Sequence, residues 1–414
     1  MLSSRRAYPA LVDSIVVITL TTFADARQAL RSRDLRQALY DAGERLMTGV
    51  IVNLHGDAHI ARRRLENRLF RRDTFAWYER ERIPVIIDDV LAAAVTAGRG
   101  DLLPLARRTM MTLSVDVAGV DVGPDRFDVF YELMNRLARA STVAHAVGDP
   151  APVIADGDAA LATFATEFFA PSRARRQALV DAHAAGRLDA DGLPRDVLTT
   201  LLRNQDQLEL SDAEVLREVA YFPWVGSHST AAQLVHSMHH LLEWLDARPD
   251  DRPRLVHDAA LRQRFVHESL RLHPASPVAL RIATTDVTLG PHHVGAGETV
   301  VIDIVHANRQ PDVFGADPDR FDPFRTIAEG VAPWGLSFGH GSHACLGQEL
   351  AGGMAPDDVH EHHLLGAVAL MAGEMLAAGA RRDPDDPPAR DASTTRPMWG
   401  RYPVVFDPSL RVAP

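Results

Sequence analysis

The chain has 414 residues, 46% of them hydrophobic and 24% charged, which is enough apolar sequence to bury a large core. Its 44 basic and 55 acidic residues give a formal charge of −11, which argues against a nucleic-acid surface as its main role. All 44 basic residues are arginine. The absence of lysine excludes Schiff-base chemistry, a pyridoxal-phosphate anchor and a phosphate-loop lysine.

A single cysteine, Cys345, excludes an intramolecular disulfide, a CxxC redox pair, a cysteine-rich zinc site and an iron–sulfur cluster. The most apolar early stretch, Leu11–Leu20, is ten residues long and contains Asp13, whereas a membrane-spanning helix needs roughly 20 residues. This stretch also lacks the small-residue cleavage pattern of a signal peptide. We therefore expect a cytoplasmic protein with no membrane segment.

The first half of the chain predicts a short strand followed by helices. The strand is the β-branched run Val16–Leu20. Helices are expected over 23–30, 59–70, 87–98 and 103–120, with turn-rich breaks over 146–157 and 186–195.

A long helix is predicted from Ser211 to about Leu245. Ser211 and Glu214 form an S-x-x-E capping box at its start. The apolar pattern continues for roughly 35 residues, or about 50 Å of helix, which is enough to cross a domain. Pro223 lies inside this segment and should kink it or break a turn.

The second half predicts one more helix and the remaining strands. The helix covers Ala259–Leu272 and is closed by Pro274, strand-like alternation follows over 276–305, and 401–406 forms another strand. The predicted fold class is therefore mainly α with small β-sheets. No linker is long enough to separate independent domains, so residues 1–414 are expected to form a single domain.

The segment around Cys345 carries the chemistry of the chain. From Ser337 to Gly347 it reads SFGHGSHACLG, and its first two glycines permit a tight turn that brings backbone close to a bulky ligand. Cys345 stands at the start of an apparent helix from Leu346 onward, where free N–H groups and the helix dipole favour a thiolate. A thiolate fixed there can serve as an axial metal ligand. The alternative is a small buried core residue.

The pattern F-G-x-G-x-H-x-C-x-G resembles the haem-binding loop of the cytochrome P450 family at every fixed position. The resemblance implies the P450 fold, with haem b (Fe-protoporphyrin IX) between the long central helix and the Cys-loop helix, and with Cys345 as the axial ligand of the iron. The usual N-terminal helix and strand are expected to be truncated, because His59 lies so early in the chain. The implied haem contacts are His59, Arg63, Arg281, Phe338, Gly339, His343, Cys345 and Gly347.

Glu268 and Arg271 lie three residues apart on one predicted helix face and can form an ion pair. By itself this spacing is typical of a solvated surface pair. The resemblance implies instead a buried structural network with a second arginine, for which Arg320 is the candidate.

The distal side of the haem departs from the family's pattern. The long helix should carry A/G-G-x-acid-Thr, but the aligned residues from Val225 to Thr230 read VGSHST. Gly226 leaves room for a small ligand, while His228 stands at the acid position and Ser229 at the alcohol position. Histidine titrates near neutrality, so a proton relay through these residues or Thr230 would be altered. The candidate catalytic residues are Gly226, His228, Ser229 and Thr230.

An arginine-rich segment, 62–72, stands out on an acidic chain. Its spacing wraps around a helix, so a solvated charged face is one interpretation. The other is a docking surface for an acidic electron carrier such as a ferredoxin, steered electrostatically. The docking candidates are Arg62, Arg64, Arg68, Arg71 and Arg72.

Two groups of histidines fall outside these motifs. His360, His362 and His363 lie in a segment that interrupts the helix expected after Cys345, and their spacing favours a solvated turn over a metal site. His236 and His240 are interpreted as packing or surface residues, because no third ligand is evident.

Three functions remain open on the sequence. The leading one is a haem-thiolate monooxygenase of bacterial specialised metabolism, which oxidises a small organic molecule with O₂ and electrons from a ferredoxin. The second keeps the haem but catalyses a redox-neutral rearrangement, N–O cleavage with nitrene transfer, or dehydration, because His228 and Ser229 replace the usual pair. The third is a haem sensor or carrier without catalysis.

Overall fold

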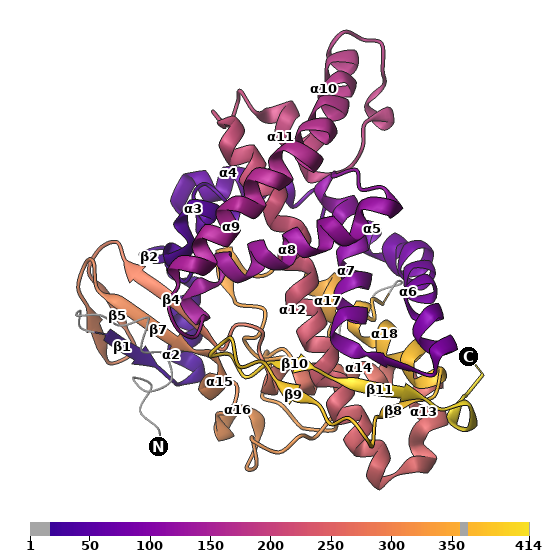
Figure 1. The fold of residues 1–414 in the computed structure, drawn as a ribbon. Helices are drawn as coiled ribbons and strands as arrows, with labels where there is room; N and C mark the ends of the chain where they lie inside the picture. The colour runs from indigo at the N-terminus through magenta and orange to yellow at the C-terminus, as the bar shows by residue number, and fades with distance from the viewer. Residues whose placement is uncertain (1–16, 357–362, 414) are drawn as a thin grey trace. The chain divides into compact units, whose positions relative to one another are not determined.

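The computed structural model describes residues 17–356 and 363–413. The protein is mainly helical with small sheets, as predicted. It divides into two compact units. Unit 1 comprises the chain up to Arg36, Arg72–Thr109 and Ser229 onward, and unit 2 comprises Gln37–Arg71 and Met110–His228 (Figure 1). The expectation of one domain over residues 1–414 stays a prediction.

Unit 1 contains a four-stranded sheet in the order β1-β7-β4-β2. β1 (Val17–Leu20) runs parallel to β7 (Thr299–Asp303), and β7 runs antiparallel to β4 (Val278–Ala283). β2 (Leu35–Gln37) follows α2 (Phe23–Arg31), whose N-cap Thr22 accepts a hydrogen bond from the backbone of Asp25. Strands predicted over 16–20 and 276–305 are thus present. The shared apolar core includes Leu20, Phe23, Ala29, Leu35, Val300, Ile302 and Phe314.

The other elements of unit 1 are short strands and helices. A second sheet has the order β3-β11-β8, with β3 at Arg99–Asp101, β8 at Ala380–Arg382 and β11 at Pro403–Phe406. The two-stranded pairs are β5 (Val287–Leu289) with β6 (His292–Val294), and β9 (Ala389–Arg390) with β10 (Trp399–Arg401). The helices are α5 (Arg72–Trp77), the π-helical turn η4 (Tyr78–Arg82), α6 (Ile83–Ala97), α13 (Arg252–His257), α14 (Ala259–Leu272), α15 (Ile304–Ala307), α16 (Pro311–Phe314), α17 (Gln348–Gly352) and α18 (Ala367–Ala377).

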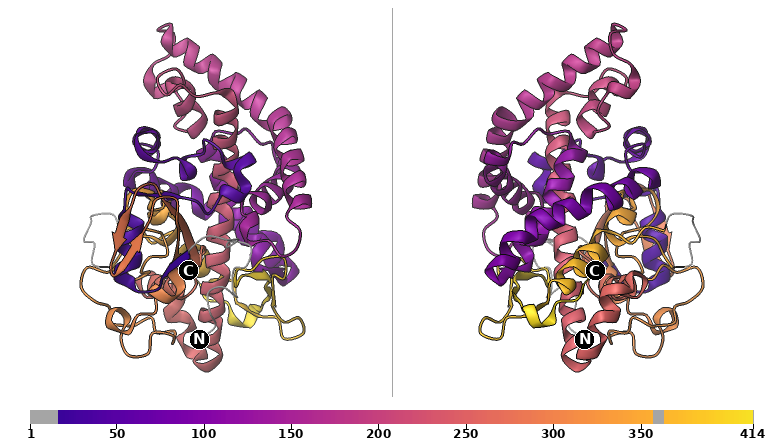
Figure 2. Two further views of the ribbon diagram at one scale, coloured as in Figure 1. Left: turned by 90° about the vertical axis from the view of Figure 1, so that its left-hand side faces the viewer. Right: turned by 90° about the vertical axis from the view of Figure 1, so that its right-hand side faces the viewer.

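Unit 2 is helical and is coloured from indigo to pink in Figure 2. The predicted turn-rich break over 146–157 is confirmed over 146–150 and wrong from Ala151 onward, where helix α9 begins. Pro152 is tolerated in its first turn, where the missing N–H would have no helical partner. Gly157 serves close packing, since a Cβ there would lie 2.2 Å from the Cβ of Ala140. The helices are α3 (Glu44–Met47), α4 (Gly56–Glu66), α8 (Phe127–Ser141), α9 (Ala151–Phe164), α10 (Ala170–Ala184) and α11 (Val197–Asn204).

The long helix α12 covers Asp212–Ala247, and α7 covers Leu102–Ala118; each has residues in both units. The predicted capping box is confirmed: the backbone N–H of Ser211 donates to the Glu214 carboxylate (2.8 Å), and that of Glu214 donates to the Ser211 hydroxyl (3.2 Å). Pro223 lies within α12 without ending it. Its carbonyl accepts a hydrogen bond from the hydroxyl of Ser227 at 2.7 Å.

Helix α14 covers the predicted range 259–272 and carries a buried charge network. The carboxylate of Glu268 is 4% exposed and accepts hydrogen bonds from Arg271 at 2.7 and 2.8 Å and from Arg325 at 3.1 Å. The expectation that Arg320 is the second arginine is wrong. Arg320 is exposed and pairs with Asp322 at 3.1 Å, whereas the guanidinium of Arg325 turns inward and also donates to the carbonyl of Asp317.

Unit 2 buries a second charge cluster between α4 and α12. Arg62, 3% exposed, pairs with Glu218 at 2.7 Å, and Glu218 also accepts a hydrogen bond from the backbone of Ile51. Glu66 is fully buried 4.0 Å from Arg62, and neither of its carboxyl oxygens has a hydrogen-bond partner among the described residues. Burial and the nearby Glu218 raise the pKa of Glu66, and burial raises the pKa of Glu218 to about 7.

The charge network on α14 predicts unequal roles for two neighbouring arginines. Arg325→Gln leaves a buried carboxylate with fewer donors and should lower the free energy of unfolding by about 2 kcal/mol. Arg320→Gln removes an exposed pair and should cost less than about 1 kcal/mol. Urea unfolding of both variants measures the difference. Equal losses would contradict the assignment of Arg325 to the network.

The buried carboxyls of unit 2 predict a loss of stability with rising pH. A carboxyl whose pKa is raised in the folded state stabilises the fold below its ordinary pKa, and that contribution is lost as pH rises through the raised value. Glu66→Gln keeps the shape of the side chain but cannot ionise, so its unfolding free energy should fall less between about pH 5 and pH 8.

Urea unfolding across this range measures the effect, since one unit of pKa difference is worth about 1.4 kcal/mol. The control is Glu44→Gln, which changes an exposed carboxylate of the same unit. Parallel curves for wild type and Glu66→Gln would show that Glu66 does not carry the pH dependence.

Candidate functional site

The loop around Cys345 lies in unit 1 and folds back on itself. Gly339 and Gly341 have φ angles of 70° and 72°, in the left-handed region that glycine adopts readily. The backbone N–H of Cys345 donates to the carbonyl of Phe338 at 2.9 Å, and that of Gly339 donates to Leu336 at 2.8 Å. The Cys345 side chain is exposed at the end of this turn. The buried-core interpretation of the single cysteine is therefore wrong.

The helix that follows the loop differs from the sequence expectation. A short helical turn, η10, covers Gly341–His343, and α17 begins only at Gln348 and ends at Gly352. Gly353, with φ at 76°, closes α17, and α18 starts at Ala367. The predicted interruption after Leu350 is therefore confirmed.

Asn308 ties the Cys345 loop to helix α14. Its side-chain amide donates to the hydroxyl of Ser337 at 2.9 Å and to the carbonyl of Arg271 at 3.1 Å, while its carbonyl oxygen accepts from the backbone of Leu336 at 2.8 Å. A Cβ on Gly335 would lie 2.3 Å from that oxygen, so only glycine fits there. The partners of Asn308 are 28 to 37 residues away in the chain, so local sequence patterning does not identify these hydrogen bonds.

The expected propionate contacts divide between the two units. In unit 1, Arg281 on β4 is 4% exposed and donates to the carbonyl of Leu280 at 2.9 Å, and His343 is half-buried in η10. In unit 2, His59 and Arg63 lie on α4, four residues apart. Burial, aided by Arg63 and His55, lowers the pKa of His59 to about 4. At neutral pH His59 therefore offers an uncharged N–H donor.

These residues fit a haem, each within its own unit. An exposed thiol on a tight loop suits an axial iron ligand, and the arginine fork and the neutral histidine N–H suit carboxylate oxygens. The expected haem contacts Phe338, Gly339 and Gly347 stay a prediction. That all the expected contacts from both units share one haem stays a prediction.

The predicted distal residues lie on α12. In unit 2 the His228 ring has one nitrogen 3.0 Å from the carbonyl of Trp224 and the other 2.9 Å from the side-chain oxygen of Asn135 on α8. A Cβ on Gly226 would lie 2.6 Å from the hydroxyl of Ser114, so this glycine allows α12 to approach α7 closely. In unit 1, Ser229 is half-buried and Thr230 is 5% exposed. Sequence patterning did not find Asn135.

The arginine-rich segment is only partly a surface. Arg62 as a docking residue is wrong, because it is buried against Glu218. Arg72, in unit 1, is held by Glu349 of α17 through hydrogen bonds of 2.7 to 3.0 Å. The exposed side chains of unit 2 that remain are Arg64, Arg68 and Arg71.

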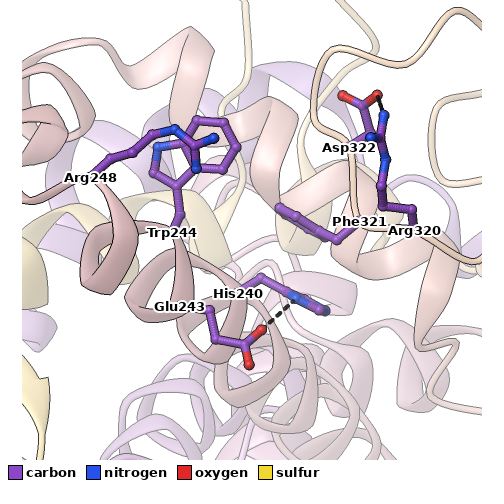
Figure 3. A pocket seen from close by; sticks show the side chains of 7 residues that line it. All are labelled: His240, Glu243, Trp244, Arg248, Arg320, Phe321 and Asp322. Carbon is purple, nitrogen blue, oxygen red and sulfur yellow. Dashed lines mark hydrogen bonds and ion pairs between the residues drawn. The ribbon is translucent and has the colours of Figure 1, made fainter.

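A separate groove of about 420 Å³ lies in unit 1 (Figure 3). The rings of Phe321 and His240 stack with centroids 4.1 Å apart, and the guanidinium of Arg248 lies 4.0 Å from the ring centre of Trp244. Burial lowers the pKa of His240 to about 3, and the buried His236 stacks on His273 at 4.3 Å, as packing residues would. The groove is lined by His240, Glu243, Trp244, Arg248, Arg320, Phe321 and Asp322, none of which is an expected haem contact.

Residues 17–356 and 363–413 contain neither a candidate membrane span nor a candidate metal cluster. No helix there is long and apolar enough to cross a membrane. No group of three or more His, Cys, Asp or Glu side chains there is arranged to hold a metal ion. His360 and His362 lie outside the described residues, and the imidazole of His363 donates a hydrogen bond to the side-chain oxygen of Gln263 at 2.8 Å.

Comparison with known proteins agrees with this geometry. The family model described as Cytochrome P450 matches residues 255–354, the segment that holds α14, β4, β7 and the Cys345 loop. Cytochrome P450 BJ-3 of Bradyrhizobium diazoefficiens is 39% identical over 166 residues, 38% of each chain. Cyclooctat-9-en-7-ol 5-monooxygenase of Streptomyces melanosporofaciens is 30% identical over 204 residues, 44% of this chain and 43% of that protein. The matched region thus spans less than half the length of these relatives.

The likeness in fold extends over much more of the chain. The crystal structure of CalO2 superposes with a TM-score of 0.72 at 22% identity, covering 98% of this chain and 96% of CalO2. At 22% identity, this superposition supports a similar fold only. The family model and the relatives support a similarity in sequence in the region that includes the Cys345 loop. Together with the loop geometry, they show that the chain is similar to cytochrome P450 proteins, in its sequence over residues 255–354 and in its fold.

Proposed function

We propose that the protein is a haem-thiolate oxidoreductase that acts on a small organic molecule in bacterial specialised metabolism. The observation that carries the proposal is that the only cysteine of the sequence has an exposed thiol. The loop that presents this thiol is held in place by hydrogen bonds of Asn308 and by the buried network around Glu268. A side chain presented in this way is available to a ligand while its backbone stays rigid.

The proposed haem-holding residues have defined roles within each unit. Haem b held by a thiolate supplies, when bound, the redox chemistry that the side chains lack. Cys345 would be the iron ligand, Arg281 and His343 would hold propionates from unit 1, and His59 and Arg63 would do so from unit 2. Phe338 and Gly347 would shape the loop against the haem face.

Relatives give the proposal its reaction class. One is named a 5-monooxygenase of cyclooctat-9-en-7-ol, and another, 39% identical over 161 residues, is named nocardicin C N-oxygenase. Both names describe oxidation of a small organic molecule. By analogy, a monooxygenase supplied with electrons by a ferredoxin-type carrier is the first candidate, with Arg64, Arg68 and Arg71 as the docking cations.

A second function is favoured by the surroundings of His228. Both of its ring nitrogens face oxygen acceptors, the Trp224 carbonyl and Asn135. An imidazole whose two nitrogens both lie at hydrogen-bond distance from oxygen atoms must break one of these contacts before it can transfer a proton to a ligand. This arrangement supports the alternative of a redox-neutral or group-transfer reaction, which needs no proton relay to dioxygen. A haem carrier without catalysis is the third possibility, and turnover of any substrate would exclude it.

The iron ligand is tested by replacing the thiol. The reduced wild-type protein should give the red-shifted Soret band of a thiolate-ligated haem under CO, and Cys345→Ala should lose it entirely. His340→Ala, which changes a neighbouring loop residue outside the expected contacts, is the control and should keep the band. An unchanged spectrum of Cys345→Ala would refute all three haem-based functions.

The reaction class is tested on the distal residues. Restoring an acid and a threonine with the double variant His228→Glu/Ser229→Thr should increase O₂ uptake driven by reductant by at least about tenfold, because positioned acid–base groups contribute factors of this size or more. Oxygen electrode measurements with and without reductant decide the question. Stoichiometric O₂ consumption by the wild type would exclude the redox-neutral alternative, whereas wild-type turnover without O₂ or reductant would exclude the monooxygenase.

A further inference from the structure

In unit 1, the described residues that follow α17 and those that precede α18 meet at one point. The backbone N–H of Met354 donates to the carbonyl of Leu364 at 2.9 Å. A Cβ on Gly366 would lie 2.3 Å from the backbone nitrogen of Gly353, so the two limbs touch backbone to backbone. We call residues 352–354 and 364–366 the neck. The closeness of its limbs explains the glycines at both ends.

One face of α14 holds both limbs of the neck. Gln263 and His267 lie four residues apart, one turn along the same side of the helix. The imidazole of His267 donates to the carbonyl of Gly352 at 2.8 Å on the outgoing limb. The amide of Gln263 donates to the carbonyls of Leu364 (2.8 Å) and Leu365 (3.0 Å) on the returning limb. Burial lowers the pKa of His267 to about 4, so it acts as a neutral donor.

Glu79 supplies the matching acceptor from another element. It lies in the π-helical turn η4, and its carboxylate accepts hydrogen bonds from the backbone N–H groups of Leu365 (3.2 Å) and Gly366 (2.6 Å). These groups precede the first turn of α18, where a negative charge also meets the positive end of the helix dipole. Burial raises the pKa of Glu79 while the two hydrogen bonds oppose the shift.

The neck is in direct contact with the thiol loop. A Cβ on Gly352 would lie 3.0 Å from the ring of Phe338, whose carbonyl accepts the hydrogen bond from Cys345. α17 has only five residues between Cys345 and the neck, and its backbone bonds cannot fix it alone. Its other anchor is Glu349, which is held by Arg72 of α5.

We propose that Glu79 and Gln263 are positioning residues for the Cys345 loop. Their hydrogen bonds fix the returning limb of the neck to α14 and η4. These bonds are needed because α17 and α18 are separate helices. The thiol loop is then fixed through Gly352 and Phe338. The inference rests on the proposed function for its consequence at the iron, but the hydrogen bonds themselves are a property of the polypeptide.

The test uses Glu79→Gln, Gln263→Leu and, as a matched control, Glu81→Gln, which changes an exposed carboxylate in the same π-helical turn. Amide hydrogen exchange of the peptide covering 345–352 is measured on the full-length protein with and without haem. Weakening the hydrogen bonds that Glu79 accepts, or losing those that the Gln263 amide donates, should raise local opening by roughly tenfold. The haem-loaded variants should also show a larger share of the CO complex without thiolate ligation. Glu81→Gln should match wild type in both measurements.

Two results would overturn the proposal. One is unchanged exchange over 345–352 in both Glu79→Gln and Gln263→Leu. The other is exchange that rises equally throughout the protein, which would indicate a general loss of stability instead of a local role. Failure of the proposed function would look different, because the wild-type protein would then show no thiolate–CO band while exchange in the 345–352 peptide still responded to the variants.

Discussion

The buried carboxylate of Glu268 is the interaction on which the proposed thiol site depends. A charge that is 4% exposed is tolerated only when donors surround it, and here they come from Arg271, Arg325 and the backbone N–H of Asp322. These donors belong to α14 and to the segment that follows α16. The need to satisfy one carboxylate therefore fixes the irregular segment that leads to the Cys345 loop.

Helix α14 extends this constraint in two directions. On the Glu268 side, Arg271 donates to the carbonyl of Asn308 at 2.7 Å, and Asn308 in turn holds the backbone before the loop. On the other side, Gln263 and His267 hold the chain after the loop. One straight helix thus anchors the segments that enter and leave the Cys345 loop. An exposed thiol can stay fixed in this way, because its position does not depend on packing of the thiol itself.

Features with local causes could be predicted from the sequence. The capping box at Ser211, the range of α14 and the strands over 276–305 all follow from periodicity and turn residues within a short window. The loop predicted over 146–157 is a helix from Ala151 onward because of a contact with a distant segment. Gly157 indicates a loop when the sequence is considered locally, but in the fold it permits close packing against Ala140. Helix packing overrides propensity at such positions.

The errors among site residues have a common origin as well. Arg320 and Arg325 are five residues apart in an irregular segment, where no period tells which guanidinium points inward. Arg62 was assigned to a surface because its partner, Glu218, lies 156 residues away in the chain. Asn135 was missed for the same reason, since nothing near His228 in sequence points to it. The spacing of residues within a helix shows which of them share a face. Contacts with residues that are distant in the chain decide which face is buried.

Buried carboxyls and histidines determine how the protein responds to pH. Arginine stays charged throughout the ordinary range, so proton uptake falls on carboxyls and histidines. In unit 1 the buried histidines have lowered pKa values, about 3 for His236 and about 4 for His267, and their neutral form stabilises the fold until acid is added. In unit 2 the buried carboxyls Glu66 and Glu218 have raised pKa values, and their neutral form is lost towards alkaline pH. Burial favours the uncharged form of both kinds of group, so buried histidines lose their stabilising contribution towards acid pH and buried carboxyls lose theirs towards alkaline pH. Each unit contains both kinds, since the pKa of His59 in unit 2 is lowered and that of Glu79 in unit 1 is raised.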